Sequence, residues 1–244
     1  MKAQEATQLG VRLAELVQDR QMEAAEALLA PVLAERTPFA LLDRIGVALG
    51  AAPAEAVNPF LENLAAQRSE GGWPVIGSAL RCQLDGDWSG AFSRCRRFIV
   101  DADIWYATDI LGERVCGPAL LSAFQPALDQ LAPWRSDANR WVRRTTGVAV
   151  HFWAKRRRGQ PGSDVEAQAL MAFLQPQFTE GELEAVKGVG WGLKTLGRYY
   201  PDLMADWLRE QVAQRRPYRA LMLRKALTYL PAAQRARVTE SAPP

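Results

Sequence analysis

The stretch RWVRRTTGVAV (residues 140–150) recurs in outline twice, as EAVKGVGWGL (184–193) and as LMLRKALTYL (221–230). In each copy an apolar residue is followed by Arg or Lys and then by a short apolar run. If Arg143, Lys187 and Arg224 are equivalent, the copies lie 44 and 37 residues apart, which is the spacing of two-helix HEAT-type repeats. One helix pair cannot bury its apolar face alone, so such pairs stack into a curved superhelix. The recurring cations would then line its concave side.

Helix-forming residues dominate the rest of the chain, and no segment shows the sustained alternation rich in Val, Ile and Thr that marks a strand. Breakers such as SEGGWPV and RGQPGSD separate segments of roughly 10–20 residues. The sequence therefore predicts an all-α fold of HEAT-like helical repeats, stacked as an α-α superhelix with a concave basic groove. We expect one repeat domain over residues 1–237 and a disordered C-terminal tail over residues 238–244.

Two of the expected helices have candidate start signals. Ser136 or Asp137 can cap the helix that contains RWVRRT. Thr179, with Glu182 three residues later, gives a capping-box pattern before the second copy of the repeat.

Charge is distributed unevenly along the chain, although its formal net value is only +3. Residues 1–133 include 11 basic and 17 acidic residues, whereas residues 134–237 include 19 basic and 9 acidic ones. Such asymmetry favours a polyanion as the partner of the C-terminal half. Arginines that only solvate helix faces would give the same composition, so charge alone leaves both interpretations open.

Several function classes find no support in the sequence. Cys82, Cys95 and Cys116 have neither metal nor redox spacing, and His151 is the only histidine. We expect no metal, no cofactor and no His-based catalytic triad, and we interpret His151 as structural. The N-terminus is charged throughout, and the longest uncharged stretch, 115–128, is too short to span a bilayer. We therefore expect a cytoplasmic protein that has no membrane anchor and acts as a monomer.

Three segments contain candidate functional residues. In IWYATD, Trp105 and Asp109 stand four residues apart and so share one helix face, although a core Trp beside a solvated Asp would give the same spacing. RWVRRT interleaves Trp141 with arginines, which suits phosphate and sugar contacts. GVGWGLKT (188–195) departs from a Walker phosphate loop at Leu193, so we place it inside a helix. Each of its three glycines costs roughly 1 kcal/mol there, which close approach of another backbone would explain.

Taken together and in this order, these three segments on a helical-repeat chain resemble the AlkD-like family of bacterial DNA alkylation repair glycosylases. The resemblance spans roughly residues 73–230. The family's aromatic-to-catalytic-Asp motif corresponds to Trp105 and Asp109, and its Trp-x-x-Arg helix corresponds to Trp141 and Arg144. Its Gly-Trp-x-Leu-Arg/Lys helix corresponds to residues 190–194. Two positions depart from the pattern: Ile104 replaces a frequent second aromatic residue, and Lys194 replaces a common Arg.

The resemblance implies a DNA glycosylase that hydrolyses the N-glycosidic bond of positively charged N3-alkyladenine and N7-alkylguanine in double-stranded DNA. Such a base leaves as a neutral molecule and needs no general acid, unlike the leaving group of ordinary glycoside hydrolysis. Asp109 would stabilise the oxocarbenium-like sugar and orient water, while Trp105 and Trp191 would hold the deoxyribose. The lesion would not need to be extruded into a pocket.

The remaining candidates would bind the DNA backbone. They are Arg143, Arg144, Lys187, Lys194, Arg224 and Tyr106. Five such cations on phosphates predict a logarithmic salt dependence of affinity with a slope of about −4 to −5. Two alternatives use the same fold: a non-catalytic DNA-binding protein for damaged or branched DNA, and a protein-binding scaffold for an acidic partner.

Overall fold

The computed structural model of the chain describes residues 1–240, and every regular element in them is helical. The prediction of an all-α fold of HEAT-like helical repeats is thus confirmed. The last helix, α15 (Ala232–Thr239), buries Val238, so the expected tail does not begin at residue 238. The rest of that tail, residues 241–244, lies outside the described part of the chain. None of the helices in residues 1–240 is both long enough and apolar enough to cross a membrane.

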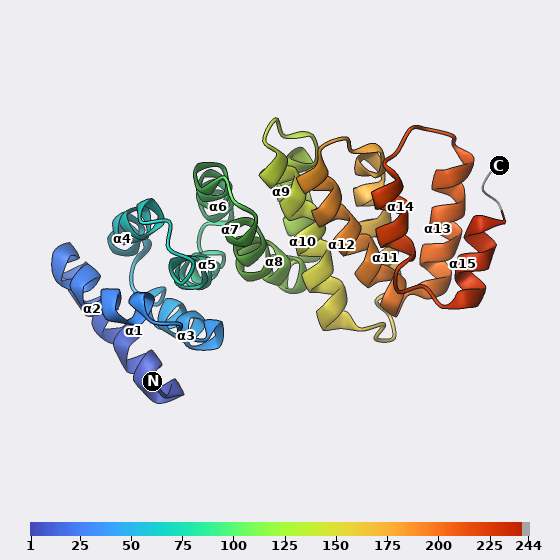
Figure 1. The fold of residues 1–244 in the computed structure, drawn as a ribbon. Helices are drawn as coiled ribbons and strands as arrows, with labels where there is room; N and C mark the ends of the chain where they lie inside the picture. Colours follow the sequence, from blue (N-terminus) through green and yellow to red (C-terminus); the bar gives the residue numbers. More distant parts are fainter. Residues whose placement is uncertain (241–244) are drawn as a thin grey trace. The chain divides into compact units, whose positions relative to one another are not determined.

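The chain divides into two compact units, Met1–Val115 and a second unit that begins at Cys116. The single repeat domain over residues 1–237 stays a prediction. Within the first unit α1, α3, α5 and α7 pack in series, and the even-numbered helices pack against them (Figure 1). The elements are α1 (Ala3–Gln18), α2 (Met22–Ala34), α3 (Phe39–Leu49), α4 (Ala54–Ala66), α5 (Gly72–Gln83), α6 (Trp88–Ala102), α7 (Trp105–Leu111) and the π-helical turn η1 (Gly112–Cys116).

Glycines allow the serial helices of the first unit to approach closely. A Cβ atom on Gly10 of α1 would lie 2.5 Å from the carbonyl oxygen of Ile45, and one on Gly46 of α3 would lie 2.4 Å from that of Val75. Helix α5 lies in the middle of the series and buries every residue from 72 to 80. A helix that is apolar on all sides is typical of such an interior position.

In the second unit α10, α12 and α14 pack in series (Figure 1). These three helices begin 43 and 37 residues apart, close to the spacings of 44 and 37 read from the sequence. The elements are α8 (Gly117–Ser122), α9 (Phe124–Leu131), η2 (Ala132–Ser136), α10 (Arg140–Arg157), α11 (Asp164–Leu174), η3 (Gln175–Thr179), α12 (Leu183–Tyr199), α13 (Pro201–Ala213), α14 (Ala220–Leu227) and α15.

The glycines of GVGWGLKT lie inside α12, as predicted, and two of them, Gly188 and Gly192, meet α10. A Cβ atom on Gly192 would lie 2.7 Å from the carbonyl oxygen of Gly147 in α10, and one on Gly147 would lie 2.2 Å from that of Gly188. The backbones of α10 and α12 therefore touch, which explains why residues of low helix propensity stand here.

The predicted helix starts were wrong in detail. Asn139, rather than Ser136 or Asp137, caps α10, since its side chain accepts hydrogen bonds from the backbone nitrogens of the next residues. Helix α12 begins only after Glu182 and has no side-chain cap bond. The physical reason is that Ser136 and Thr179 end the 3₁₀ turns η2 and η3, and both hydroxyls bond carbonyls of those turns.

Candidate functional site

Trp105 is an exposed ring in the first unit. It is the first residue of α7 and is 55% exposed, which rules out the core packing that its spacing allowed. Its ring meets that of Tyr106 edge-on, with centroids 5.8 Å apart. Asp109 follows one turn later on the same side of α7 and is half-buried. The helix therefore presents an aromatic face next to a partly desolvated carboxylate.

An ion-pair network anchors the turn that follows α7. The guanidinium of Arg114 in η1 donates to both carboxylate oxygens of Asp43 from Nε and Nη2, at 3.0 and 3.3 Å, and to Glu113 at 3.0 Å. Ser78 of α5 donates to the same Asp43 carboxylate. A Cβ atom on Gly77 would lie 2.8 Å from the Cβ of Arg114, so the glycine makes room for this side chain. The π-helical turn behind Asp109 is thus tied to α3 and α5, and such turns occur frequently at functional sites.

Arg144 and Lys187 of the second unit share one carboxylate. Arg144 is only 7% exposed, and its Nη1 donates to the backbone oxygen and the Oε2 of Glu184, at 3.2 and 3.3 Å. Lys187 donates to the Oε1 of Glu184 at 2.6 Å. The stem of Arg144 lies across Gly188, where a Cβ would approach it to 2.5 Å. Arg144 is therefore held rigidly between α10 and α12.

Arg143 lies apart from these residues. Its Nε donates to Glu180 at 2.6 Å, and its Nη1 donates to the backbone oxygens of Asp137 and Ala138. Both charged side chains of the pair are at least 86% buried, since the exposed fractions are 14% and 10%. These bonds fix the approach to α10, and the structure does not bring Arg143 together with the other predicted cations.

Trp191 stacks on the histidine. The ring centroids of His151 in α10 and Trp191 lie 3.9 Å apart, and the ring planes are inclined by 24°. His151 Nδ1 lies 2.7 Å from the hydroxyl of Thr195, which donates to the carbonyl of Trp191. Burial, together with the nearby charges of Lys155 and Lys194, lowers the pKa of His151 to about 4. A neutral imidazole therefore covers one face of Trp191.

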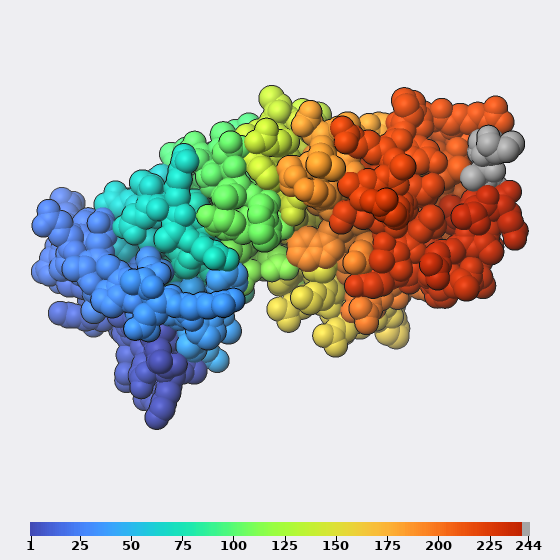
Figure 2. All heavy atoms as spheres, viewed as in Figure 1, coloured from blue at the N-terminus to red at the C-terminus, as the bar shows by residue number. Residues whose placement is uncertain are grey.

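Cations from three helices lie near Lys225. This residue of α14 is half-buried, and burial lowers its pKa, as do the nearby charges of Lys194, Arg144, Lys187 and Arg224 in decreasing order. We call these five residues the cationic cluster. The four neighbours are the predicted DNA-binding cations other than Arg143, so the structure brings them together. The orange and red surfaces of α12 and α14 adjoin one another in this unit (Figure 2).

Two residues near these cations, Lys225 and Tyr229, were not among the residues predicted from sequence. Lys194 lies over the ring of Tyr229, 4.2 Å from its centroid. A signal for Lys225 existed, because the pair RR at 143–144 recurs as RK at 224–225. From the sequence we aligned Arg143 with Arg224. Aligning Arg144 with the residue after Arg224 identifies Lys225.

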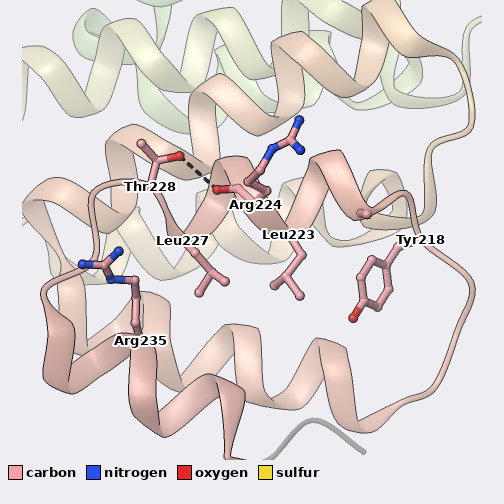
Figure 3. A pocket seen from close by; sticks show the side chains of 7 residues that line it. Tyr218, Leu223, Arg224, Leu227, Thr228 and Arg235 are labelled. Carbon is pink, nitrogen blue, oxygen red and sulfur yellow. Dashed lines mark hydrogen bonds between the residues drawn. The ribbon is translucent and has the colours of Figure 1, made fainter. Parts of the chain in front are cut away.

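A hollow of about 630 Å³ lies beside α14. Leu223, Leu227 and Tyr218 face it, whereas the guanidinium of Arg224 is turned away from the two leucines (Figure 3). Arg224 therefore extends away from the apolar part of this hollow. Within residues 1–240, no group of three or more His, Cys, Asp or Glu side chains is placed to hold a metal ion.

Comparison with known proteins places these features in one family. The family model described as DNA alkylation repair enzyme matches residues 78–230, more than half of the chain. The match includes Trp105 and Asp109 as well as α10, α12 and α14. No curated protein and no solved structure gives a match. The chain therefore belongs to the DNA alkylation repair enzyme family, whose members act in the repair of alkylated DNA.

Proposed function

We propose that this protein is an alkylpurine DNA glycosylase that releases N3-alkyladenine and N7-alkylguanine from duplex DNA, the first step of base excision repair. The observation on which the proposal depends is the arrangement on α7. An exposed Trp105 ring precedes the half-buried Asp109 by one turn, and the adjoining turn is anchored by Arg114 and Asp43. A carboxylate held beside an exposed ring is an arrangement suited to stabilising a developing sugar cation. A carboxylate with only a solvating role would not need the neighbouring ring.

The chemistry needs little beyond this pair. An alkylated purine of this kind is cationic, so cleavage of its glycosidic bond releases a neutral base and leaves positive charge on the sugar. Asp109 stabilises that charge electrostatically and orients the attacking water, whose addition at C1′ and loss of a proton complete the hydrolysis. The face of Trp105 is attractive to the same cation because the ring quadrupole is negative there. No metal or cofactor enters this scheme.

The second unit supplies DNA binding in this proposal. Arg144, Lys187, Lys194 and Arg224 contact phosphates, and Trp191 offers to a deoxyribose the ring face that His151 leaves uncovered. In the first unit Tyr106, which braces Trp105, contacts the strand. We leave Arg143 outside the phosphate-binding set because its bonds to Glu180 and to two backbone carbonyls already use its guanidinium. We further propose that the protein acts as a monomer in the cytoplasm.

The decisive experiment measures release of free 7-methylguanine from methylated duplex DNA by the wild type and by Asp109→Asn. This change keeps the size of the side chain and removes its charge. It should slow excision by about 100-fold or more while leaving duplex affinity nearly unchanged, as loss of one electrostatic stabiliser does.

A matched control is Asp101→Asn, which removes an exposed carboxylate near the end of α6. It should excise at the wild-type rate. Wild-type excision by Asp109→Asn would refute the assignment of the acid. Salt-dependent DNA binding with no base release by the wild type would instead favour a non-catalytic DNA-binding protein, which the cationic cluster alone would also support.

A further inference from the structure

The stem of Lys225 crosses α12 at a glycine. A Cβ atom on Gly190 would lie 2.6 Å from the Cδ of Lys225, 2.9 Å from its Cβ and 3.4 Å from its Cγ. Gly190 thus leaves a slot that the aliphatic part of the lysine fills. Lys194, which lies near Lys225, also lies near His151, the residue that stacks on Trp191. The slot therefore holds Lys225 in the neighbourhood of the ring that we propose for sugar binding. The slot also explains why residue 190 is a glycine, since it faces Lys225 of α14 and not α10.

The charge of Lys225 is not compensated by protein carboxylates. None of the ion pairs or hydrogen bonds within residues 1–240 gives its ammonium an acidic partner. Lys194 and Arg224 likewise have no carboxylate partner among these residues, and Lys194 lies over a tyrosine ring instead. Glu184 is engaged by Arg144 and Lys187. Lys194 and Lys225 are half-buried and Arg224 is exposed. Cations that lie near one another without a carboxylate partner attract an anion from outside the chain.

We infer that Lys225, positioned by the slot at Gly190 and flanked by Lys194 and Arg224, forms a phosphodiester-binding site next to Trp191. The inference rests on the proposed function, since the ligand is the backbone of the DNA that the second unit binds. A lysine acts on phosphate as a compact point charge, which suits a position reached by a straight stem through a narrow slot. The site contributes affinity for any DNA sequence, because phosphate contacts do not read bases.

The first test compares variants at Lys225 in binding to an undamaged duplex over a range of salt concentrations. Lys225→Met keeps an unbranched stem over Gly190 and removes the charge. It should reduce the magnitude of the slope of log affinity against log salt by about one, and lower affinity roughly 5- to 10-fold near 0.1 M salt. Lys225→Arg should keep most of the slope. Arg219→Met, at an exposed cation outside the cluster, should leave the slope as in the wild type.

The second test moves the lysine without changing any charge. Gly190→Ala should weaken duplex binding because the new Cβ displaces the stem, whereas Gly181→Ala, where nothing lies within 4 Å of the new atom, should not. In the Lys225→Met background Gly190→Ala should add little, because the charge it displaces is already gone.

The results separate this inference from the proposed function. If the wild type binds duplex DNA and Lys225→Met shows an unchanged slope, the phosphodiester site at Lys225 is refuted while DNA binding stands. An effect of Gly190→Ala that is the same with and without Lys225 would refute the role of the slot. A wild type that does not bind duplex DNA at all refutes the proposed function itself.

Discussion

The pKa of His151 predicts a measurable loss of stability at mildly acidic pH. Burial, with the charges of Lys155 and Lys194, lowers this pKa from 6.5 to about 4, so the folded protein holds the imidazole neutral where the unfolded chain would protonate it. Between those two values the unfolded state binds more protons than the folded state, and stability must fall as pH falls. The loss begins near pH 6.5 and is complete near pH 4.

The magnitude follows from the shift itself. A difference of about 2.5 pKa units corresponds to about 3 kcal/mol in total, at about 1.4 kcal/mol per unit. Between pH 7 and pH 5 the expected part is about 2 kcal/mol. His151 is only 7% exposed, so solvent screening reduces this figure little. Other titrating groups also contribute to the pH dependence of the free energy of unfolding. Their contribution is the same in a variant that lacks only this imidazole, so it cancels when the two proteins are compared.

The assay is denaturant unfolding of the wild type and of His151→Phe at pH 7 and at pH 5. Phenylalanine preserves a ring for stacking on Trp191 but cannot take up a proton. The wild type should lose about 2 kcal/mol relative to the variant between the two pH values. A stability difference that does not change with pH would show that His151 is not held neutral by its surroundings. The stacking on Trp191 would then need another explanation.

Three further predictions follow from exposure and charge. Trp105→Ala should slow excision strongly but hardly change the melting temperature, whereas Trp153→Ala, in the core, should cost about 3–5 kcal/mol of stability. Arg143→Ala should lower stability and leave the salt slope of DNA binding unchanged, while Arg224→Ala should reduce the magnitude of that slope by about one. Because the pKa of Lys225 is lowered by burial and by its cationic neighbours, DNA affinity should fall as pH rises toward 10 more steeply in the wild type than in Lys225→Arg, which keeps its charge.

Much of the fold was accessible from sequence because its signals are local. Helix propensity, breakers and the recurrence of RWVRRTTGVAV gave the helical class and the spacing of α10, α12 and α14. The helix starts were not accessible in the same way, since Ser136 and Thr179 have cap-forming side chains but are used inside 3₁₀ turns. The division into compact units near Val115 lies inside a helical turn, so no breaker marks it in the sequence.

The sequence was sufficient to predict which residue types form the candidate site. It did not show which side chains contact one another or which are exposed. Trp105 and Asp109 could be placed on one helix face from their spacing alone. Whether the ring is exposed depends on which helices cover α7, and that information is not local. The same applies to His151, which sequence interpretation left as a structural residue. His151 and Trp191 lie 40 residues apart in the sequence. Their rings meet only because α10 and α12 touch through their glycines.

The salt dependence of DNA binding depends on which basic residues are already paired with carboxylates, and a count of basic residues does not contain that information. From sequence, five cations on phosphates predicted a salt slope of about −4 to −5. In the structure Arg143 is tied to Glu180 and contacts no phosphate in our proposal. Arg144 and Lys187 share Glu184, whose negative charge offsets part of theirs at the phosphates that they contact. The cations of the cluster without a carboxylate partner in residues 1–240 are Lys194, Arg224 and Lys225. Phosphates neutralised by these three unpaired cations alone give a slope of about −3. A measured slope near −4.5 would mean that Glu184 gives up its partners to the DNA backbone, and Glu184→Gln would then change the slope little.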